Sequence, residues 1–424
     1  MAVVKRPAGA PALDVILSAV RAAVAAHLLR STGRPQSRGR ILRRRAPRND
    51  IVGETTVVES RKTPGNTPFA LGFRMPAEWE PHEATWLAWP HNRTDWPGKF
   101  ATIPWVYGEI VRKLVPGELV RILVNSRSHE NAARRVLTRV GVDPGRVEFL
   151  HCPTNRGWTR DTGPIFVRRC GREREVAVAR FRFNAWARYR DWQRDAQVPD
   201  RAARALGLRL FPVRIGKRDI VLEGGAIDVN GRGTLLTTEE CLLDPVTQVR
   251  NPGLGRRDIE AVFRDYLGAT HVLWLGRGIA GDDTHGHVDD LCRFVNPHTV
   301  VLCREANPED VNYRALEDNY ERLRSMRLED GSKITVVPLP MPAPLYIDGF
   351  RLPASYANFY IGNAAVIVPT FNDPNDRVAL GMLGDLFSDR PVVGIHAVDL
   401  VPVSYTHLRA HETPEHLVCR LLLE

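Results

Sequence analysis

The sequence predicts an α/β protein built from mixed sheets. Strand-like and helical segments recur along the chain in one order: strands, a connecting helix, then strands again. With 424 residues and 43% hydrophobic content, the chain can bury a large core in one big domain or two. It lacks the strict βαβ alternation and the Gly-x-Gly-x-x-Gly after a strand that would indicate a Rossmann sheet.

Residues 1–66 are predicted to be a separate basic extension, either disordered or translated from a mis-called upstream start codon. Residues 1–62 hold 13 Lys and Arg against 4 Asp and Glu, which is +9 of the net charge of +10. Such an arm could bind nucleic acid or an anionic surface, or serve as an organelle presequence, but a solvated tail is the simpler expectation. Because the rest of the chain is nearly neutral, nucleic acid is not an expected partner of the folded body.

The cysteines indicate a reducing compartment, the cytoplasm. There are six of them, and none forms a Cys-x-x-Cys pair, which argues against a disulfide framework or a zinc ribbon. No apolar run approaches the ~20 residues of a membrane span, so no membrane association is expected.

In the first half of the chain, the folded body is expected to begin near Phe69. The apolar run at residues 85–90 predicts a buried strand that ends at a proline. Helical periodicity follows at residues 103–114 and at residues 128–140, the second with Ser128 as its expected N-cap. Further strands are expected at residues 119–124, 147–150 and 164–168, with a loop at residues 158–163.

The second half repeats the same order of elements. A helix at residues 256–267 is expected to stop at Gly268. Residues 288–295 and 300–304 are expected to pair as strands. The other expected strands are residues 220–222, 234–237, 271–275, 333–339, 359–361, 365–368 and 392–395, and the other expected helices are residues 313–328 and 376–387.

The candidate site centres on His287 and Asp289. On a strand, residues two apart share one face, so this base and this carboxylate would point into the same space. Asp161, in the loop that begins at Trp158, and Glu223, before two glycines, are expected to meet them. Two aspartates can hold a guanidinium, and a histidine held by a third carboxylate can act as general acid and base.

An attacking atom is absent from this set of residues. A thiolate would be the natural nucleophile, because a nearby guanidinium and an imidazolium would lower its pKa. A metal site is the rival interpretation of His287, but only His285 lies near it at ligand spacing, so no metal site is predicted. Cys292 is expected to be a small buried hydrophobic residue.

Seven motifs, in order and in register, make the chain resemble the agmatine deiminase (agmatine iminohydrolase) family of the bacterial-type peptidylarginine deiminase group. The resemblance runs from about residue 69 to about residue 400. The motifs are residues 73–82 (FRMPAEWEPH), 158–164 (WTRDTGP), 183–186 (FNAW), 222–225 (LEGG), 236–243 (LTTEECLL), 286–289 (GHVD) and 354–360 (ASYANFY).

This resemblance implies the guanidine-modifying (pentein) fold, a five-bladed α/β propeller with pseudo-fivefold symmetry. It implies hydrolysis of agmatine to N-carbamoylputrescine and ammonia through a cysteine thiouronium intermediate, a step of putrescine and polyamine synthesis, without metal or organic cofactor.

The resemblance also implies roles for residues of this chain. Asp161 and Asp289 would grip the guanidinium, His287 would shuttle protons and Glu223 would orient His287. In addition, Trp158 would line the substrate, and Asp283 is a candidate for binding the free amine of agmatine. A homo-oligomer remains possible.

After Leu400 the chain departs from the family pattern. The family's nucleophile follows a glycine run and a histidine near the C-terminus, and no such run follows here; Cys419 has no glycine turn beside it. Residues 403–424 resemble the in-frame translation of a sequencing-library adapter. We therefore expect a catalytic domain at residues 67–402, a non-native tail, and little or no deiminase activity in this polypeptide.

Three other interpretations remain open. The chain could act on peptidyl-arginine or another guanidine compound within the same family. It could be a catalytically dead propeller whose basic arm contacts nucleic acid, in which case binding would depend on salt and on residues 1–66. A metallohydrolase is the third.

Overall fold

The structure is a computed structural model that describes residues 65–169 and 175–401. Two compact units divide the chain, Met1–Gly65 and Asn66–Glu424. The predictions for the basic extension and for the tail after residue 402 fall outside the described residues. The helices and strands described all lie in the second unit.

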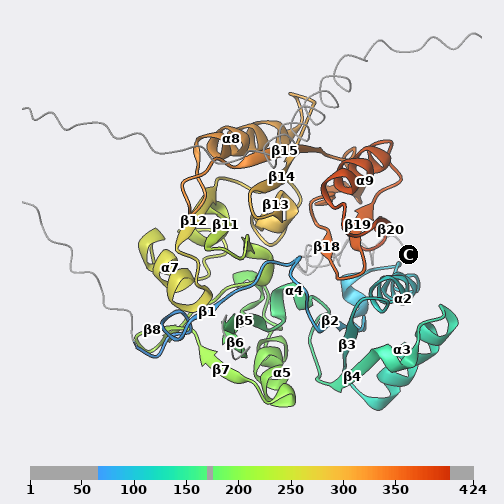
Figure 1. The fold of residues 1–424 in the computed structure, drawn as a ribbon. Coiled ribbons are helices and arrows are strands. Elements are labelled where there is room, and N and C mark those ends of the chain that lie inside the picture. Colours follow the sequence, from blue (N-terminus) through green and yellow to red (C-terminus); the bar gives the residue numbers. More distant parts are fainter. Residues whose placement is uncertain (1–64, 170–174, 402–424) are drawn as a thin grey trace, which may run out of the picture. The chain divides into compact units, whose positions relative to one another are not determined.

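One strand pattern recurs in four sheets, drawn one after another in Figure 1. In each, two antiparallel strands are followed by at least one helix and by a third strand parallel to the second. These sheets comprise β5 (Ile165–Arg169), β6 (Val176–Arg180) and β7 (Arg209–Pro212), with β1 (Phe73–Arg74) added at one edge; β10 (Asp228–Val229), β11 (Thr234–Thr238) and β12 (His271–Leu275); β13 (Cys292–Asn296), β14 (Thr299–Arg304) and β15 (Thr335–Pro340); and β18 (Tyr360–Ile361), β19 (Val366–Thr370) and β20 (Val392–His396).

The helices of these four sheets are α5 (Val198–Leu206), α6 (Glu239–Leu243) and α7 (Arg256–Val262), α8 (Val311–Ser325) and α9 (Asn375–Leu386). None of the helices in the described residues is long and apolar enough to cross a membrane.

A fifth sheet is entirely parallel. It contains β2 (Ala84–Ala88), β3 (Leu119–Val124) and β4 (Val147–His151), connected by α2 (Ile103–Leu114) and α3 (Arg127–Arg139). The central strand β3 is buried along almost its whole length, as expected for a parallel strand covered on both faces. Ser126, not Ser128, caps α3, because the Ser126 side chain accepts a hydrogen bond from the backbone of His129.

The sheet of β18–β20 packs against the parallel sheet of β2–β4 and its helix α2. Segments far apart in the sequence therefore lie side by side (Figure 1). Ile367 of β19 and Ile395 of β20 share one core cluster with Ile103 and Val111 of α2. The indole Nε1 of Trp96 donates a hydrogen bond of 3.1 Å to the carbonyl of Leu400. A second core cluster joins the sheets of β5–β7 and β10–β12.

Most of the predicted elements are confirmed, with three corrections besides that of the N-cap of α3. Residues 288–290 are not part of a strand: they form a short 3-10 helix, and β13 begins only at Cys292. Residues 220–222 make a single isolated bridge, between Val221 and Arg182. The helix at 256–267 ends in a π turn, although Gly268 stops it in the left-handed conformation as predicted.

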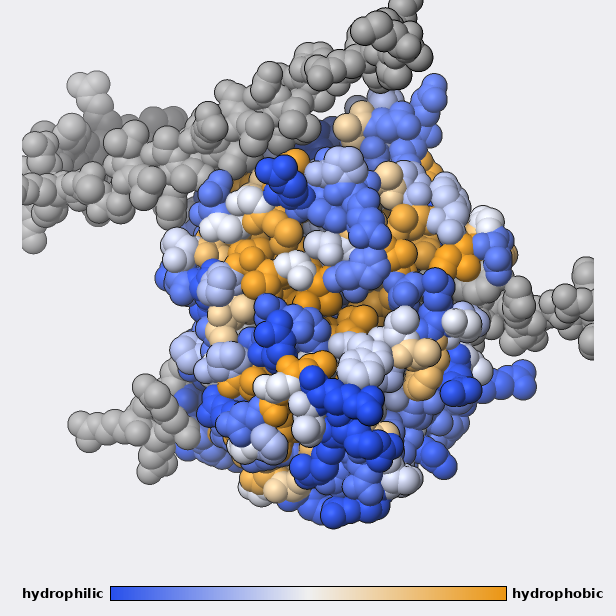
Figure 2. All heavy atoms as spheres, turned by 90° about the vertical axis from the view of Figure 1, so that its right-hand side faces the viewer, coloured by the Kyte–Doolittle hydropathy of each residue, from blue (hydrophilic) through white to orange (hydrophobic). Residues whose placement is uncertain are grey.

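Several elements have no counterpart in the prediction. They include α4 (Thr159–Thr162), β1, β6, α5, β7, β10, α6 and two hairpins, β8 (Arg214–Ile215) with β9 (Arg218–Asp219) and β16 (Tyr346–Ile347) with β17 (Phe350–Arg351). Figure 2 turns the side of α2, α9 and β20 toward the viewer and shows hydrophobic residues gathered between hydrophilic ones.

Candidate active site

The four predicted site residues converge. Asp161 comes from α4, Glu223 precedes a 3-10 turn at Gly224–Ala226, and His287 and Asp289 flank the start of the 3-10 helix at Val288–Asp290. His287 Nδ1 lies 3.7 Å from Asp161 Oδ1, and His287 Nε2 lies 3.7 Å from Glu223 Oε2. The convergence is as predicted, but its cause is different: a helical turn, not strand alternation, brings His287 and Asp289 together.

Gly225 is the point where these groups meet. A Cβ atom at this position would lie 2.5 Å from His287 Nδ1, 2.7 Å from Asp161 Oδ1 and 3.1 Å from Asp289 Oδ1. The Gly225 amide also donates a 3.0 Å hydrogen bond to Asp161 Oδ1. The glycine pair was noted in the sequence, but only the structure gives this one its role: it leaves room for two carboxylates and an imidazole to face one another.

Trp186 holds the other oxygen of Asp161. Its indole Nε1 donates a 3.0 Å hydrogen bond to Asp161 Oδ2. Residues Ala185, Trp186 and Ala187 all have positive φ, between 52° and 57°, a conformation that is strained for non-glycine residues. Sequence reasoning included Trp186 in a motif but assigned it no role.

Arg250 fixes Glu223 as an anion. Both side chains are fully buried, and Arg250 Nε donates a 3.3 Å hydrogen bond to Glu223 Oε1. Burial alone would raise the pKa of Glu223, but Arg250 and His287 outweigh it and lower the pKa to about 2. No local pattern in the sequence pointed to Arg250.

The site is rich in negative charge. Burial opposes protonation of His287, but Asp161, Cys241 and Glu223 hold its pKa well above the usual value, so an imidazolium is favoured at neutral pH. Burial raises the pKa of Asp161, and it raises the pKa of Asp289 to about 6 although Arg160 and His287 act in the opposite direction. A cation placed between the two aspartates would favour their ionised forms.

A network of charged side chains holds the Asp289 carboxylate. Arg160 Nε lies 3.5 Å from Asp289 Oδ2, and Arg160 also pairs with Glu78. The buried Arg293 lies 3.0 Å from the same glutamate. These pairs limit the positions that the Asp289 carboxylate can take.

Trp158 and Asp283 lie outside this core of the site. Trp158 packs against Trp96, with ring centroids 5.6 Å apart, and borders the cluster around Trp186. Asp283 accepts a hydrogen bond from the hydroxyl of Tyr189, whose ring contacts Trp186 edge-on at 5.8 Å. A row of aromatic rings thus connects Asp283 with Asp161.

A cysteine that the sequence analysis had not placed here, Cys241 of α6, also joins the site. Its Sγ, a carboxylate oxygen of Glu223 and a ring nitrogen of His287 all lie within 4.8 Å of one another. Cys241 is therefore close to both Glu223 and His287. The remaining free cysteines among the described residues, Cys152, Cys292 and Cys303, are buried as well, and burial raises the pKa of all three.

Fold and site together define a protein that can hold a planar cation between two carboxylates, next to a charged histidine. The model of the Porphyromonas-type peptidyl-arginine deiminase family matches residues 74–404, and the chain belongs to this family. Among curated proteins it is 36% identical over 353 residues to the agmatine deiminase of Pseudomonas aeruginosa (strain LESB58), covering 78% of this chain and 92% of that one. The agmatine deiminase of Ectopseudomonas mendocina (strain ymp) is 35% identical over 350 residues, covering 77% and 91%.

Two solved structures share the fold. Agmatine deiminase of Enterococcus faecalis matches with a TM-score of 0.70 and 32% identity, covering 80% of this chain and 94% of that chain. A C. jejuni agmatine deiminase with a cysteine replaced by serine and with substrate bound matches with a TM-score of 0.66 and 30% identity, covering 76% and 90%. These relatives are hydrolases that act on C–N bonds.

Proposed function

We propose that the site binds the guanidinium group of agmatine and is built for its hydrolysis to N-carbamoylputrescine and ammonia. The observation that carries this proposal is the convergence of Asp161, Asp289 and His287 on the surface left open by Gly225. A guanidinium presents N–H donors in one plane, which match two facing carboxylates. The names of the relatives support agmatine as the substrate.

Each neighbouring group then has a defined part in the reaction. Asp161 and Asp289 grip the guanidinium, with Trp186 and Arg160 holding the two carboxylates in place. Glu223, kept ionised by Arg250, orients the ring of His287. His287 as an imidazolium can protonate the departing ammonia and afterwards take a proton from the attacking water.

The covalent step requires a thiolate. It would attack the guanidinium carbon, ammonia would leave, and water would then release the thiolate and the ureido product. Cys241 is not assigned as the nucleophile, because the open surface at Gly225 adjoins Asp161 and Nδ1 of His287, whereas Cys241 lies within 4.8 Å of Glu223, which faces Nε2. We place the nucleophile in the family's glycine run followed by His-Cys, which the sequence after Leu400 does not contain.

The amine end of agmatine is assigned to the region of Asp283. Its carboxylate lies at the far end of the Trp186–Tyr189 row from Asp161. A carboxylate there would favour a substrate with a free amine over peptidyl-arginine. Trp158 would line the path between the two ends.

The five-bladed propeller also belongs to this proposal. Five sheets of three or four strands occur in the described residues, and four of them share one strand pattern. The sheet of β18–β20 packs against the sheet of β2–β4. The free cysteines support a cytoplasmic location.

Ammonia release from agmatine tests the proposal. This polypeptide should release little or none, and a version that carries a family C-terminus with its His-Cys should be active, because loss of a covalent nucleophile costs several orders of magnitude in rate. Full activity of the unaltered polypeptide would refute the placement of the nucleophile. An inactive extended version that binds agmatine would instead refute the catalytic roles.

A further inference from the structure

Two buried atoms of the site face each other at ion-pair distance and make no hydrogen bond with the described residues. They are Glu223 Oε2 and His287 Nε2, which lie 3.7 Å apart. Glu223 has no exposed surface, and His287 is 3% exposed. Buried polar atoms are nearly always satisfied, so an unsatisfied pair at this separation indicates that a further group can bind between them.

The third side chain at this place is the thiol of Cys241. Its Sγ lies within 4.8 Å of a carboxylate oxygen of Glu223 and of a ring nitrogen of His287, and the residue is buried. Carboxylate, thiolate and imidazole are the ligand types that zinc takes in proteins. At Zn–N and Zn–O distances of about 2.0 Å and a Zn–S distance of about 2.3 Å, neighbouring ligand atoms are about 3.5 Å apart, so small side-chain movements would close the site.

We propose that Glu223, Cys241 and His287 form a binding site for a divalent transition metal such as Zn²⁺. A metal bound there would prevent His287 from transferring protons. Three protein ligands leave one position for water. Asp161 lies 3.7 Å from His287 Nδ1, on the opposite side of the ring from Glu223, where a carboxylate accepts the second N–H of a metal-bound histidine.

The expected effect of the metal is inhibitory. An imidazole bound to a metal through Nε2 does not form the imidazolium that proton transfer requires. The ion would also add positive charge beside the place where Asp161 and Asp289 meet, and so oppose a guanidinium cation. The metal site rests on geometry alone, whereas its inhibitory effect rests on the proton-transfer role proposed for His287.

Co²⁺ binding tests this site directly, because a thiolate ligand gives Co²⁺ a near-ultraviolet charge-transfer band. The full chain, freed of metal with a chelator, is titrated with Co²⁺ and then with Zn²⁺ in competition with a chromophoric chelator. We expect the band to appear in the unaltered protein and to disappear when Zn²⁺ displaces Co²⁺.

The variants decide where the metal binds. Cys241→Ala should remove the band and weaken Zn²⁺ binding by more than roughly tenfold, a loss that even outer-sphere changes can produce. Glu223→Gln removes one ligand but keeps the thiolate, so it should weaken metal binding and keep the band. Near-ultraviolet circular dichroism checks that both variants are folded.

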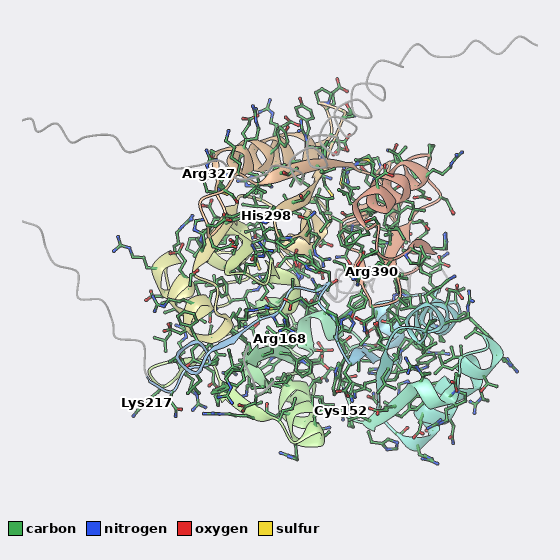
Figure 3. All side chains as sticks on the ribbon, viewed as in Figure 1. Cys152, Arg168, Lys217, His298, Arg327 and Arg390 are labelled. Carbon is green, nitrogen blue, oxygen red and sulfur yellow. The ribbon has the colours of Figure 1, made fainter. Side chains whose placement is uncertain are left out.

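Two matched controls use other thiols. Cys152→Ala removes a buried thiol that packs beside Val198 of α5 and lies toward the foot of Figure 3, and Cys419→Ala removes the thiol of the sequence after Leu400. Both should keep the band and the affinity. An unchanged band and affinity in folded Cys241→Ala, or no thiolate band in the unaltered protein, would overturn the proposal.

Discussion

Gly225 illustrates how one missing side chain determines the site. A methyl group there would approach His287, Asp161 and Asp289 within 2.5 to 3.1 Å. The backbone of this residue needs no glycine for its conformation, since Gly225 is not among the glycines with positive φ. The requirement for glycine at this position comes from space alone.

Gly225→Ala should therefore weaken agmatine binding by more than roughly tenfold, because overpacking costs about 1–3 kcal/mol and displaces the carboxylates. Calorimetric titration measures the affinity, and near-ultraviolet circular dichroism checks the fold. Unchanged affinity in a folded variant would show that the ligand does not use the surface at Gly225.

At the residue scale, the sequence predicted which polar groups converge but not what holds them. Asp161, Glu223, His287 and Asp289 lie in recognisable motifs. Their supports come from distant segments, such as Arg250, 27 positions after Glu223, and Trp186, 25 positions after Asp161. No local pattern reports which remote side chain will pack behind a carboxylate, so these supports and Cys241 were missed.

A buried cluster of charged side chains joins three segments of the chain: the one that precedes α4, the one around Asp95 and the one around Asp195. Asp195 Oδ1 accepts hydrogen bonds from the amides of Asn155 and Arg156, at 2.6 and 3.3 Å, and the Arg156 side chain donates to Asp95 at 3.0 Å. Burial raises the pKa of Asp95 and of Asp195 to about 7, even though Arg156 acts against it. The cluster thus fixes the segment that leads to Trp158.

The stability of the protein should fall as pH rises from about 5 to 8. Both carboxyls have a folded pKa near 7, above the usual value of 3.8, so the folded state binds more protons than the unfolded state in this range. The stability that protonation contributes is complete at low pH and is lost as pH rises through about 7.

Asp95→Asn isolates the effect of one of these carboxyls. Its decline in unfolding free energy between pH 5 and 8, measured with urea, should be shallower by about 1–2 kcal/mol. Asp318→Asn, at an exposed ion pair, is the control and should keep the original profile. Equal profiles for all three proteins would contradict the burial effect on Asp95.

Helix α9 carries an exposed glycine with open space around it, Gly384. Gly384→Ala should raise the free energy of unfolding by about 0.5–1 kcal/mol, because alanine loses less backbone freedom on folding. Urea denaturation measures this change, and a loss of stability would mean that the helix or its surroundings differ from those described.

At the element scale, long periodic segments were predictable and short connections were not. Helices α2 and α9 and strands β3 and β12 lie where periodicity and apolar runs predicted them. The strand expected at residues 288–295 begins only at Cys292. Residues 288–290 form a 3-10 turn instead, and this turn places His287 and Asp289 beside Gly225.

For the whole molecule, the residues of the sequence did not predict that the sheet of β18–β20 packs against the sheet of β2–β4. Ile395, 6% exposed, is part of this contact. Ile395→Ala should lower the free energy of unfolding by about 2–4 kcal/mol, whereas Val246→Ala, at a largely exposed side chain, should stay within about 0.5 kcal/mol. Equal stability of the two variants would argue against a buried contact at β20.

The most direct measurement of the proposed function is a calorimetric titration with agmatine and with putrescine, which lacks the guanidinium. The unaltered protein should bind agmatine far more tightly than putrescine. Asp161→Asn and Asp289→Asn should each weaken agmatine binding by about 10- to 100-fold, the value of a charge-assisted hydrogen bond to a buried carboxylate. Asp318→Asn should bind as the unaltered protein does. Equal affinity for both ligands, or agmatine binding that survives the loss of either carboxylate, would contradict a guanidinium held between Asp161 and Asp289.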